Sequence, residues 1–499
     1  MTATAISFPR AARLAPGALP LLAAAIFGLA CLLLVRGLDG FPLNADHSYF
    51  LPVSFYFDAT GKLDNPWLNP IDSHVFNWHG FVQPWLVAKL SPDGSWSGVT
   101  FGLDLLAGLC FAAVILAAVR LGLGTVSVLA LSSMALALLL DMRSRPEVLA
   151  TLLTVALLCL FAMRRGPLFA GTIRAAAGGV LFGTLLCTHP AIFGLSAIVF
   201  GAYALATTGR ERPRLADVAA FAGIMAAIFA ATVLGEVHFI HGGTFAEWFD
   251  GIVRHATRTA LRQDIASLTP YFVANRFLPG IALGFVFAVP PAARFWHTPA
   301  PAGLPLRLWQ GLQALVLAAL VLAVYRVAVR VPATYYNFSG LMVALALAGC
   351  LAARGSAILE KTMLAGLALL GLAGMAGTLL WLGQNAYDGP MIRATARALE
   401  ADVLGELAAG RRVCADAAVL TAMSNIGDAV QLRISVPASE EELQPSRALC
   451  DTYVRLQPQL HALSPGAIPQ FKLAADHFIA HPAAIGWMRP LYLGYAIYR

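Results

Sequence analysis

Two stretches near the amino terminus combine acidic residues, histidines and aromatic side chains. The first contains Asp46 and His47, and the second contains Asp72, Trp78 and His79. A carboxylate can take a proton from a hydroxyl group, and an aromatic ring can stack on a sugar. The two stretches therefore indicate acid–base chemistry on a sugar-like substrate. The alternative is an interfacial loop whose aromatic residues anchor at lipid headgroups, but anchoring does not require the acids and histidines.

Three arginines, Arg254, Arg258 and Arg262, recur at a spacing of four residues. A helix would align them on one face. Guanidinium groups bind phosphate oxygens through paired hydrogen bonds, which suits a lipid-linked phosphate arriving at a membrane surface. Arg330, which lies shortly before Tyr335, is a further candidate for this phosphate site. An amphipathic helix that touches anionic lipid without specificity is the alternative.

Four more acidic residues and one histidine lie at the ends of apolar segments: Asp104, Asp141, Glu147, Glu236 and His189. A carboxylate in an apolar segment is costly and usually faces a cavity or a partner. A ring of such groups around one cavity is one interpretation. Each could instead pair with a nearby arginine, as Glu147 could with Arg143 or Arg145.

The composition places these residues in a membrane protein. Hydrophobic residues make up 59% of the 499 positions and charged residues 12%, whereas a soluble domain carries about 25% charged residues. Apolar runs of about twenty residues, long enough to cross a bilayer, recur through residues 1–382. We predict about eleven spans, near residues 17–36, 98–119, 122–141, 147–163, 172–188, 190–207, 215–236, 276–292, 309–329, 337–353 and 362–382.

The distribution of charge predicts the topology. With the amino terminus inside, the inner segments carry 13 basic and three acidic residues, and the outer side of residues 1–382 carries 11 basic and 13 acidic residues. Basic residues resist translocation, so this orientation is favoured. The two stretches with Asp46 and Asp72 then lie in one long outer loop, and the carboxy-terminal tail also lies outside.

The tail, residues 383–499, has a different composition, and we call it the lobe. Alternating stretches such as residues 430–436 predict strands, so we expect a small α/β domain. Cys414 and Cys450 both lie in the lobe. In the periplasm they could form a disulfide, although two buried free thiols remain the alternative.

The order of these features resembles that of the GT-C class of integral-membrane glycosyltransferases, most of all its bacterial mannosyltransferase and aminoarabinose-transferase branch. Asp46-His47 matches an acidic pair after the first helix, and the stretch from His79 to Trp85 loosely matches a basic-proline element. Arg145-Pro146-Glu147 matches an element that opens the fourth span. His47 replaces the second acid of the family pattern, which puts a metal site in doubt.

The resemblance implies transfer of a sugar from a polyprenyl-phosphate donor to an acceptor on the periplasmic face, with inversion. Asp46 would be the catalytic base, with His47, Asp72, His79 and Glu147 as candidate supporting residues. The donor phosphate would be bound by Arg258, Arg262, Arg330 and Tyr335. No metal ion is predicted, because arginines can hold a monophosphate leaving group, although a divalent ion stays open.

The expected protein is therefore an all-α polytopic enzyme of the bacterial inner membrane, with a membrane domain at residues 1–382 and a periplasmic α/β lobe at residues 383–499. Its amino terminus is cytoplasmic. The expected partners are a polyprenyl-phosphate-linked sugar, a glycan, lipid or protein acceptor of the cell envelope, and the bilayer, with no nucleic acid. A lipid-linked oligosaccharide ligase or polymerase, a transporter or flippase, and a non-catalytic assembly subunit are the alternatives.

Overall fold

The structure of the chain is a computed structural model, which describes the helices and strands named below and a few neighbouring residues. The described segments are 82–92, 96–120, 125–142, 145–162, 171–189, 215–239, 357–416, 449–458, 470–481 and 491–499, with the short pieces 192–194, 196–197, 244–246, 299–300, 422–423 and 432–435 and the single residues 26, 54, 249, 306 and 419. The predicted spans at 17–36, 190–207, 276–292, 309–329 and 337–353 lie wholly or mostly outside these residues.

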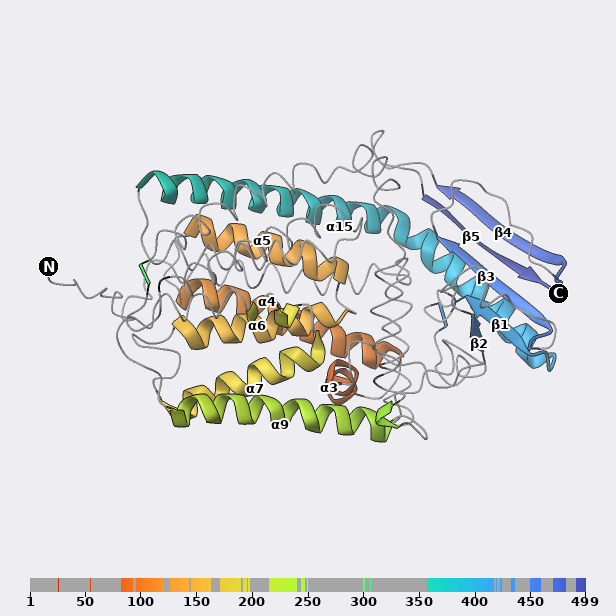
Figure 1. Cartoon of the computed structure of the whole chain (residues 1–499). Coiled ribbons are helices and arrows are strands. Elements are labelled where there is room, and N and C mark those ends of the chain that lie inside the picture. The colour runs from red at the N-terminus through yellow and green to blue at the C-terminus, as the bar shows by residue number, and fades with distance from the viewer. Residues whose placement is uncertain are drawn as a thin grey trace, which may run out of the picture.

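Five helices lie side by side in a bundle (Figure 1). They are α4 (Trp96–Arg120), α5 (Thr125–Met142), α6 (Pro146–Ala162), α7 (Thr172–Thr188) and α9 (Leu215–Phe239). Their sequences are long apolar runs without an internal proline. Pro146 occupies the first helical position of α6, where the missing N–H is tolerated. These helices occupy the places where the sequence predicts spans.

Among the described residues, two helical segments are long and apolar enough to cross a membrane, Gly98–Val119 in α4 and Leu215–Val237 in α9. The segments Pro146–Leu157 of α6 and Thr172–Thr188 of α7 are shorter apolar helices. A short helix, α3 (Val82–Leu90), lies across the bundle direction and contacts α4 and α7 (Figure 1).

The contact between α7 and α9 depends on glycines. A Cβ atom on Gly179 would lie 2.6 Å from the Phe221 carbonyl oxygen, and one on Gly183 would lie 2.9 Å from the Ile228 Cβ atom. The two glycines are four residues apart, the small-residue spacing that lets membrane helices approach closely. This packing fits a bundle whose helices associate through van der Waals contact.

Helix α15 (Ala357–Ala408) has 52 residues and connects the bundle to the lobe (Figure 1). Its first half packs on α5, where Gly371 lies so close to Ala130 that a Cβ atom would meet the Ala130 Cα at 2.4 Å. The last predicted span, 362–382, forms part of this helix. The helix continues through the predicted boundary at 382 and 383, so the two regions share one element.

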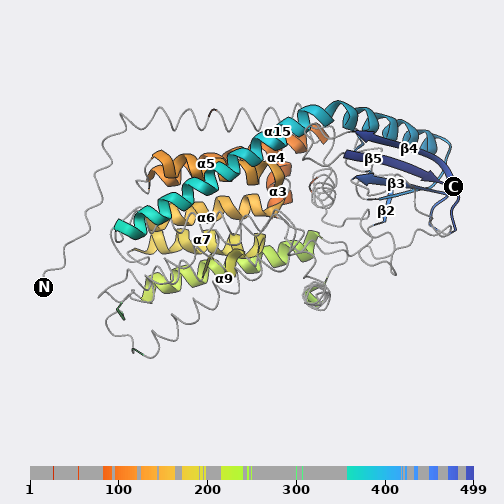
Figure 2. The ribbon, with the colours of Figure 1, turned by 90° about the horizontal axis from the view of Figure 1, so that it is seen from above.

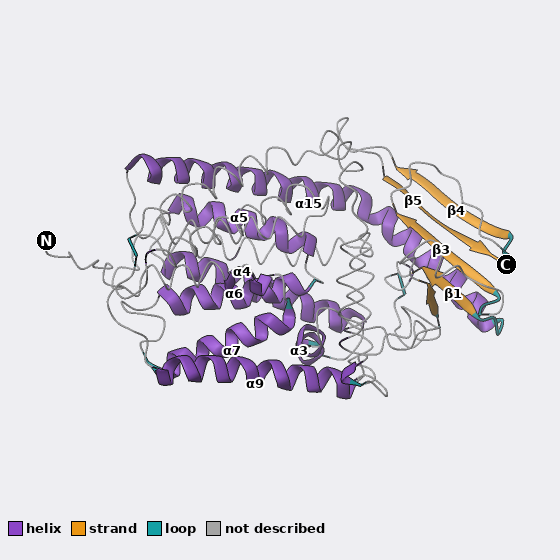
Figure 3. Cartoon of the chain, viewed as in Figure 1, coloured by secondary structure: helices purple, strands orange, loops and turns teal. Residues whose placement is uncertain are grey.

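The lobe contains a five-stranded sheet in the order β2-β1-β3-β5-β4. The strands are β1 (Val413–Asp416), β2 (Arg433–Ser435), β3 (Thr452–Pro458), β4 (Leu473–His481) and β5 (Leu491–Tyr498). Strand β1 is parallel to β2 and β3, whereas β5 is antiparallel to β3 and β4. Strand β2 falls within the alternating stretch 430–436. Figure 3 shows this sheet beyond one end of the helices.

The two faces of the sheet are covered differently. On one face, Val454 and Ile497 pack in the same hydrophobic cluster as Leu399 and Val403 of α15. The other face carries a second cluster, which contains Tyr453, Phe471, Tyr498 and both lobe cysteines. Figure 2 shows the carboxy-terminal half of α15 lying along the sheet.

Candidate functional site

Most predicted site residues lie outside the described part of the chain. These are Asp46, His47, Asp72, His79, Arg258, Arg262, Arg330 and Tyr335. Glu147, Cys414 and Cys450 are described. The structure therefore describes one of the supporting acids, Glu147, and the two lobe cysteines.

The helix ends that the sequence places outside lie together at the end of the bundle nearest the lobe (Figure 1). Helix α6 begins there, and α7 and α9 end there. We call this the outer end of the bundle. It gathers three of the predicted polar residues, Glu147, His189 and Glu236.

Glu147 is paired with Arg145 at the start of α6. The Arg145 Nε atom donates to both carboxylate oxygens at 3.0 Å, and Nη2 donates to Oε1 at 2.7 Å. The side chains are 8% and 4% exposed, so the pair is almost fully removed from solvent. A bidentate guanidinium and the positive end of α6 both favour the ionised carboxylate.

His189 connects this pair to the end of α7. Its Nε2 atom lies 3.6 Å from Glu147 Oε1, and its Nδ1 atom accepts a hydrogen bond of 3.3 Å from the Ile192 backbone N–H. In neutral imidazole one nitrogen donates and the other accepts. Nε2 of His189 therefore faces the Glu147 carboxylate, and Nδ1 faces the Ile192 backbone N–H.

The geometry of Arg145, Glu147 and His189 indicates a positioning role. Glu147 is committed to a guanidinium, so it is poorly suited to take a proton from an acceptor hydroxyl. The three residues instead hold the start of α6 against the end of α7. The sequence left two interpretations open for Glu147, a place in a ring of acids around a cavity or an ion pair with a nearby arginine. The structure shows the ion pair, with Arg145.

Other polar groups extend from this end into the bundle. The Thr151 hydroxyl donates to the Glu147 carbonyl oxygen at 2.7 Å, and the Thr154 hydroxyl donates to the Ala150 carbonyl oxygen and lies 3.4 Å from the Ser196 hydroxyl. Each hydroxyl is bonded to its own helix, so this row of threonines is satisfied within the protein.

A further contact joins α7 to α9 near the outer end. The Cys187 thiol is hydrogen-bonded to the Thr232 side chain and interacts electrostatically with the Glu236 carboxylate. Thr232 and Glu236 are 7% and 6% exposed. Two of the acids that the sequence singled out, Glu147 and Glu236, are therefore buried at the same end of the bundle.

The opposite end has its own polar contacts. The Thr172 hydroxyl donates to Asp217 at 2.8 Å, and Arg174 donates to the Leu160 carbonyl oxygen at 2.7 Å. Arg174 and Asp217 lie in the first turns of α7 and α9, the helix ends that the predicted topology places inside. These contacts tie the ends of α6, α7 and α9 together on the side away from the lobe.

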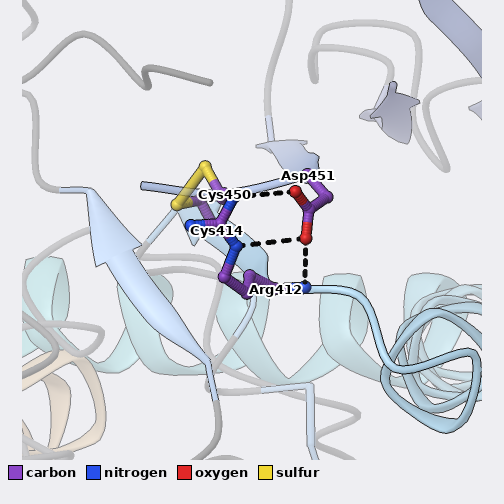
Figure 4. Close-up of a disulfide and its surroundings, with 4 residues drawn as sticks. All are labelled: Arg412, Cys414, Cys450 and Asp451. Atoms are coloured by element: carbon purple, nitrogen blue, oxygen red, sulfur yellow. Dashed lines mark hydrogen bonds and ion pairs between the residues drawn. A yellow bond between two sulfur atoms is a disulfide. The ribbon is translucent and has the colours of Figure 1, made fainter. Parts of the chain in front are cut away.

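Within the lobe, the structure joins Cys414 to Cys450, with Cα atoms 5.6 Å apart (Figure 4). Cys414 lies in β1, and Cys450 lies two residues before the start of β3. Next to them, the Arg412 backbone N–H and guanidinium both donate to Asp451, at distances of 2.8 to 3.2 Å. The disulfide and the ion pair therefore both connect β1 to β3 at the starts of these strands.

Glu406 forms a second anchor between α15 and the sheet. It accepts hydrogen bonds from Arg411 at 2.6 Å and from the Thr452 hydroxyl at 2.7 Å, and it also pairs with Arg499. Burial raises the pKa of Glu406, but the hydrogen bonds from Arg499, Thr452 and Arg411 outweigh it and lower the pKa to about 2. Sequence reasoning missed this network, because Glu406 and Arg499 are 93 residues apart.

No group of three or more metal-ligating side chains lies together within the described residues. No protein-family model, curated protein or solved structure matches the chain.

Proposed function

We propose that the protein is an integral-membrane glycosyltransferase that uses a polyprenyl-phosphate-linked sugar on the outer face of the membrane. The observation that carries the proposal is that three polar residues singled out by the sequence lie together at the end of the bundle nearest the lobe. Glu147, His189 and Glu236 lie at that end, beside a disulfide-bonded lobe. The loop that contains Asp46 and Asp72 connects elements at the same end in the predicted topology.

The proposed reaction is a single displacement. The acceptor hydroxyl oxygen forms a bond to the anomeric carbon, while the bond from that carbon to the phosphate oxygen breaks. The electron pair leaves with the phosphate, and the acceptor proton passes to Asp46. Arg258, Arg262 and Arg330 would stabilise the departing phosphate. Because Glu147 is paired with Arg145, Asp46 and Asp72 remain the candidate bases.

The arrangement favours an enzyme over a transporter. A transporter is expected to carry polar groups near the bilayer midplane, often where helices are broken. Within the part of the chain that the structure describes, α4 and α9 run unbroken through their apolar segments, and the buried ionisable groups Arg145, Glu147 and Glu236 lie at helix ends.

The test is sugar transfer by the full-length protein in vesicles that contain the native envelope acceptor. A panel of labelled polyprenyl-phosphate hexoses and pentoses would be supplied as donors. We expect Asp46→Asn to lower turnover by about 10²-fold or more while donor binding is retained. Movement of intact labelled donor across the bilayer, without sugar transfer, would show a flippase instead.

The phosphate site has a separate test. Lysine keeps the charge of arginine but loses the planar fork that matches phosphate oxygens. We expect at least one of Arg258→Lys, Arg262→Lys and Arg330→Lys to lower turnover tenfold or more with normal membrane insertion, a barrier change of about 1.4 kcal/mol. Parental rates in all three would assign these arginines to headgroup contact.

A further inference from the structure

A single helix connects the bundle to the sheet of the lobe. Among the described elements, the chain passes from the helices of the bundle to the strands once, through α15 (Figure 1). Strands β1 and β5 pack on α15, and none of the other described helices packs on the strands to a comparable extent. The position of the lobe relative to the bundle therefore depends on the shape of α15.

The two halves of α15 are held by different partners. The first half packs on α5, where Gly371 makes the closest approach. The second half is fastened to the sheet by two hydrogen bonds of 2.7 Å. The Tyr495 hydroxyl donates one to Asp402, and the Thr452 hydroxyl donates the other to Glu406. Tertiary contacts therefore fix the first half to the bundle and the second half to the lobe.

Between the two halves lie Gly389 and Pro390, and Pro390 is inside the helix. Proline has no backbone N–H, so the Ala386 carbonyl oxygen, four residues earlier, receives no helical hydrogen bond from it. The proline ring also crowds this carbonyl group. Apart from proline, glycine is the residue least favourable in a helix interior. Two consecutive residues therefore weaken α15 at one point.

The surroundings of this point permit bending. Ala386 and Pro390 are both exposed, so water can reach the carbonyl group that lacks its helical bond. The last predicted span ends at residue 382, so the weak point lies beyond the apolar segment of α15. Figures 1 and 2 both show α15 changing direction between the bundle and the sheet. Since sharp kinks in helices are most often found at proline, we assign this bend to Gly389 and Pro390.

We propose that Gly389 and Pro390 form a hinge about which the lobe moves as one body toward and away from the outer end of the bundle. Hinge motion is confined to a few residues that absorb the change in backbone dihedral angles. The disulfide between Cys414 and Cys450 and the contacts of Glu406 hold the lobe together, so the bending is concentrated at the hinge. The inference does not depend on the proposed glycosyltransferase function, and it adds a means of covering and exposing the outer end.

The experiment measures distances between pairs of spin labels in the full-length protein in nanodiscs. The labels are attached through a ketone-bearing amino acid, so the native cysteines stay in place. One pair joins Lys89 of α3 to Asp476 of β4 and spans the hinge, and the other joins Ala401 of α15 to Asp476 within the lobe. All three positions are exposed. We expect the distance distribution of the pair that spans the hinge to be about twice as broad as that of the lobe pair, or broader.

Pro390→Ala restores the hydrogen bond to the Ala386 carbonyl oxygen and removes the ring. We expect this variant to narrow the distribution across the hinge to about the width of the lobe pair. Gly383→Ala and Gly405→Ala are matched controls in the same helix, one on each side of the hinge. Their added Cβ atoms have no atom within 4 Å, and both variants should keep the parental width.

Hydrogen exchange supplies a measurement that needs neither label nor variant. In the parent, we expect the backbone amides of residues 388–394 to exchange about tenfold faster than those of residues 398–404, because the helix opens most easily at the hinge. Pro390→Ala should remove this difference. A parental distribution across the hinge as narrow as that of the lobe pair, or equal exchange in the two segments, would overturn the inference. Unchanged width in Pro390→Ala would also overturn it.

Discussion

The pair formed by Arg145 and Glu147 gives the sharpest test of what the outer end of the bundle does. We expect Glu147→Gln to destabilise the protein, because it leaves a guanidinium that is only 8% exposed without its anionic partner. Two charges about 3 Å apart interact by about 5 kcal/mol at an effective dielectric of 20. Breaking a buried pair from one side typically costs about 3–5 kcal/mol. We therefore expect a loss of about 3–5 kcal/mol in the free energy of unfolding.

Removing both charges should cost much less. A buried ion pair replaced by neutral groups of similar volume is often neutral in stability, because the desolvation of both ions is removed as well. We expect Arg145→Met combined with Glu147→Gln to recover most of the stability that Glu147→Gln loses. The coupling between the two positions should be at least about 2 kcal/mol in a double-mutant cycle.

The assay is reversible unfolding in mixed detergent micelles, followed by tryptophan fluorescence, together with sugar transfer. Asp476→Asn serves as the control, since it removes an exposed carboxylate and should leave stability within about 0.5 kcal/mol of the parent. If Glu147 only positions the helix ends, transfer should recover with stability in the double variant. An unchanged unfolding free energy in Glu147→Gln, with transfer abolished, would refute the positioning role and make Glu147 a candidate base.

Three other predictions concern the lobe, the helix contact and the topology. The stability that Glu406 contributes is present above its unfolded pKa of about 4.3 and is lost as the pH falls toward its folded pKa of about 2. Glu406→Gln should therefore make the unfolding free energy of the lobe less dependent on pH in this range. The effect should be about 1–2 kcal/mol, because solvent screens the exposed arginines that pair with Glu406. Gly183→Leu should destabilise the contact of α7 with α9 by about 1–3 kcal/mol, measured by unfolding in micelles, whereas Gly223→Leu, with no atom within 4 Å of its added Cβ, is the matched control and should not. If the lobe lies outside, Cys414 and Cys450 should react with maleimide in unfolded protein only after reduction. Protease added to intact spheroplasts should also cleave the lobe, and protection of the lobe from protease would contradict the topology.

The positions of several helices could be predicted from the sequence because apolar length is a local property. The runs at 98–119, 122–141, 147–163, 172–188 and 215–236 coincide with α4, α5, α6, α7 and α9 within a few residues. The alternation at 430–436 likewise marked β2. In each case the signal is contained in the segment itself and requires no knowledge of its neighbours.

The partners of these segments could not be predicted in the same way. The sequence offered Arg143 and Arg145 as equal partners for Glu147, and only the start of α6 at Pro146 sets Arg145 against the carboxylate. The contact of His189 with Glu147 depends on the end of α7 meeting the start of α6. The partners Thr452 and Arg499 of Glu406 come from two strands that the sheet brings together.

By itself, then, the sequence determined the apolar segments, the charge asymmetry that predicts their orientation and the change in composition at the lobe, because each is a property of consecutive residues. The tertiary structure decided that α15 runs without a break from the bundle into the lobe, that Cys414 and Cys450 are joined, and that β3 pairs parallel with β1 and antiparallel with β5. These features depend on distances between segments that are far apart in the chain. Tertiary packing determines such distances, and they cannot be predicted from the local sequence.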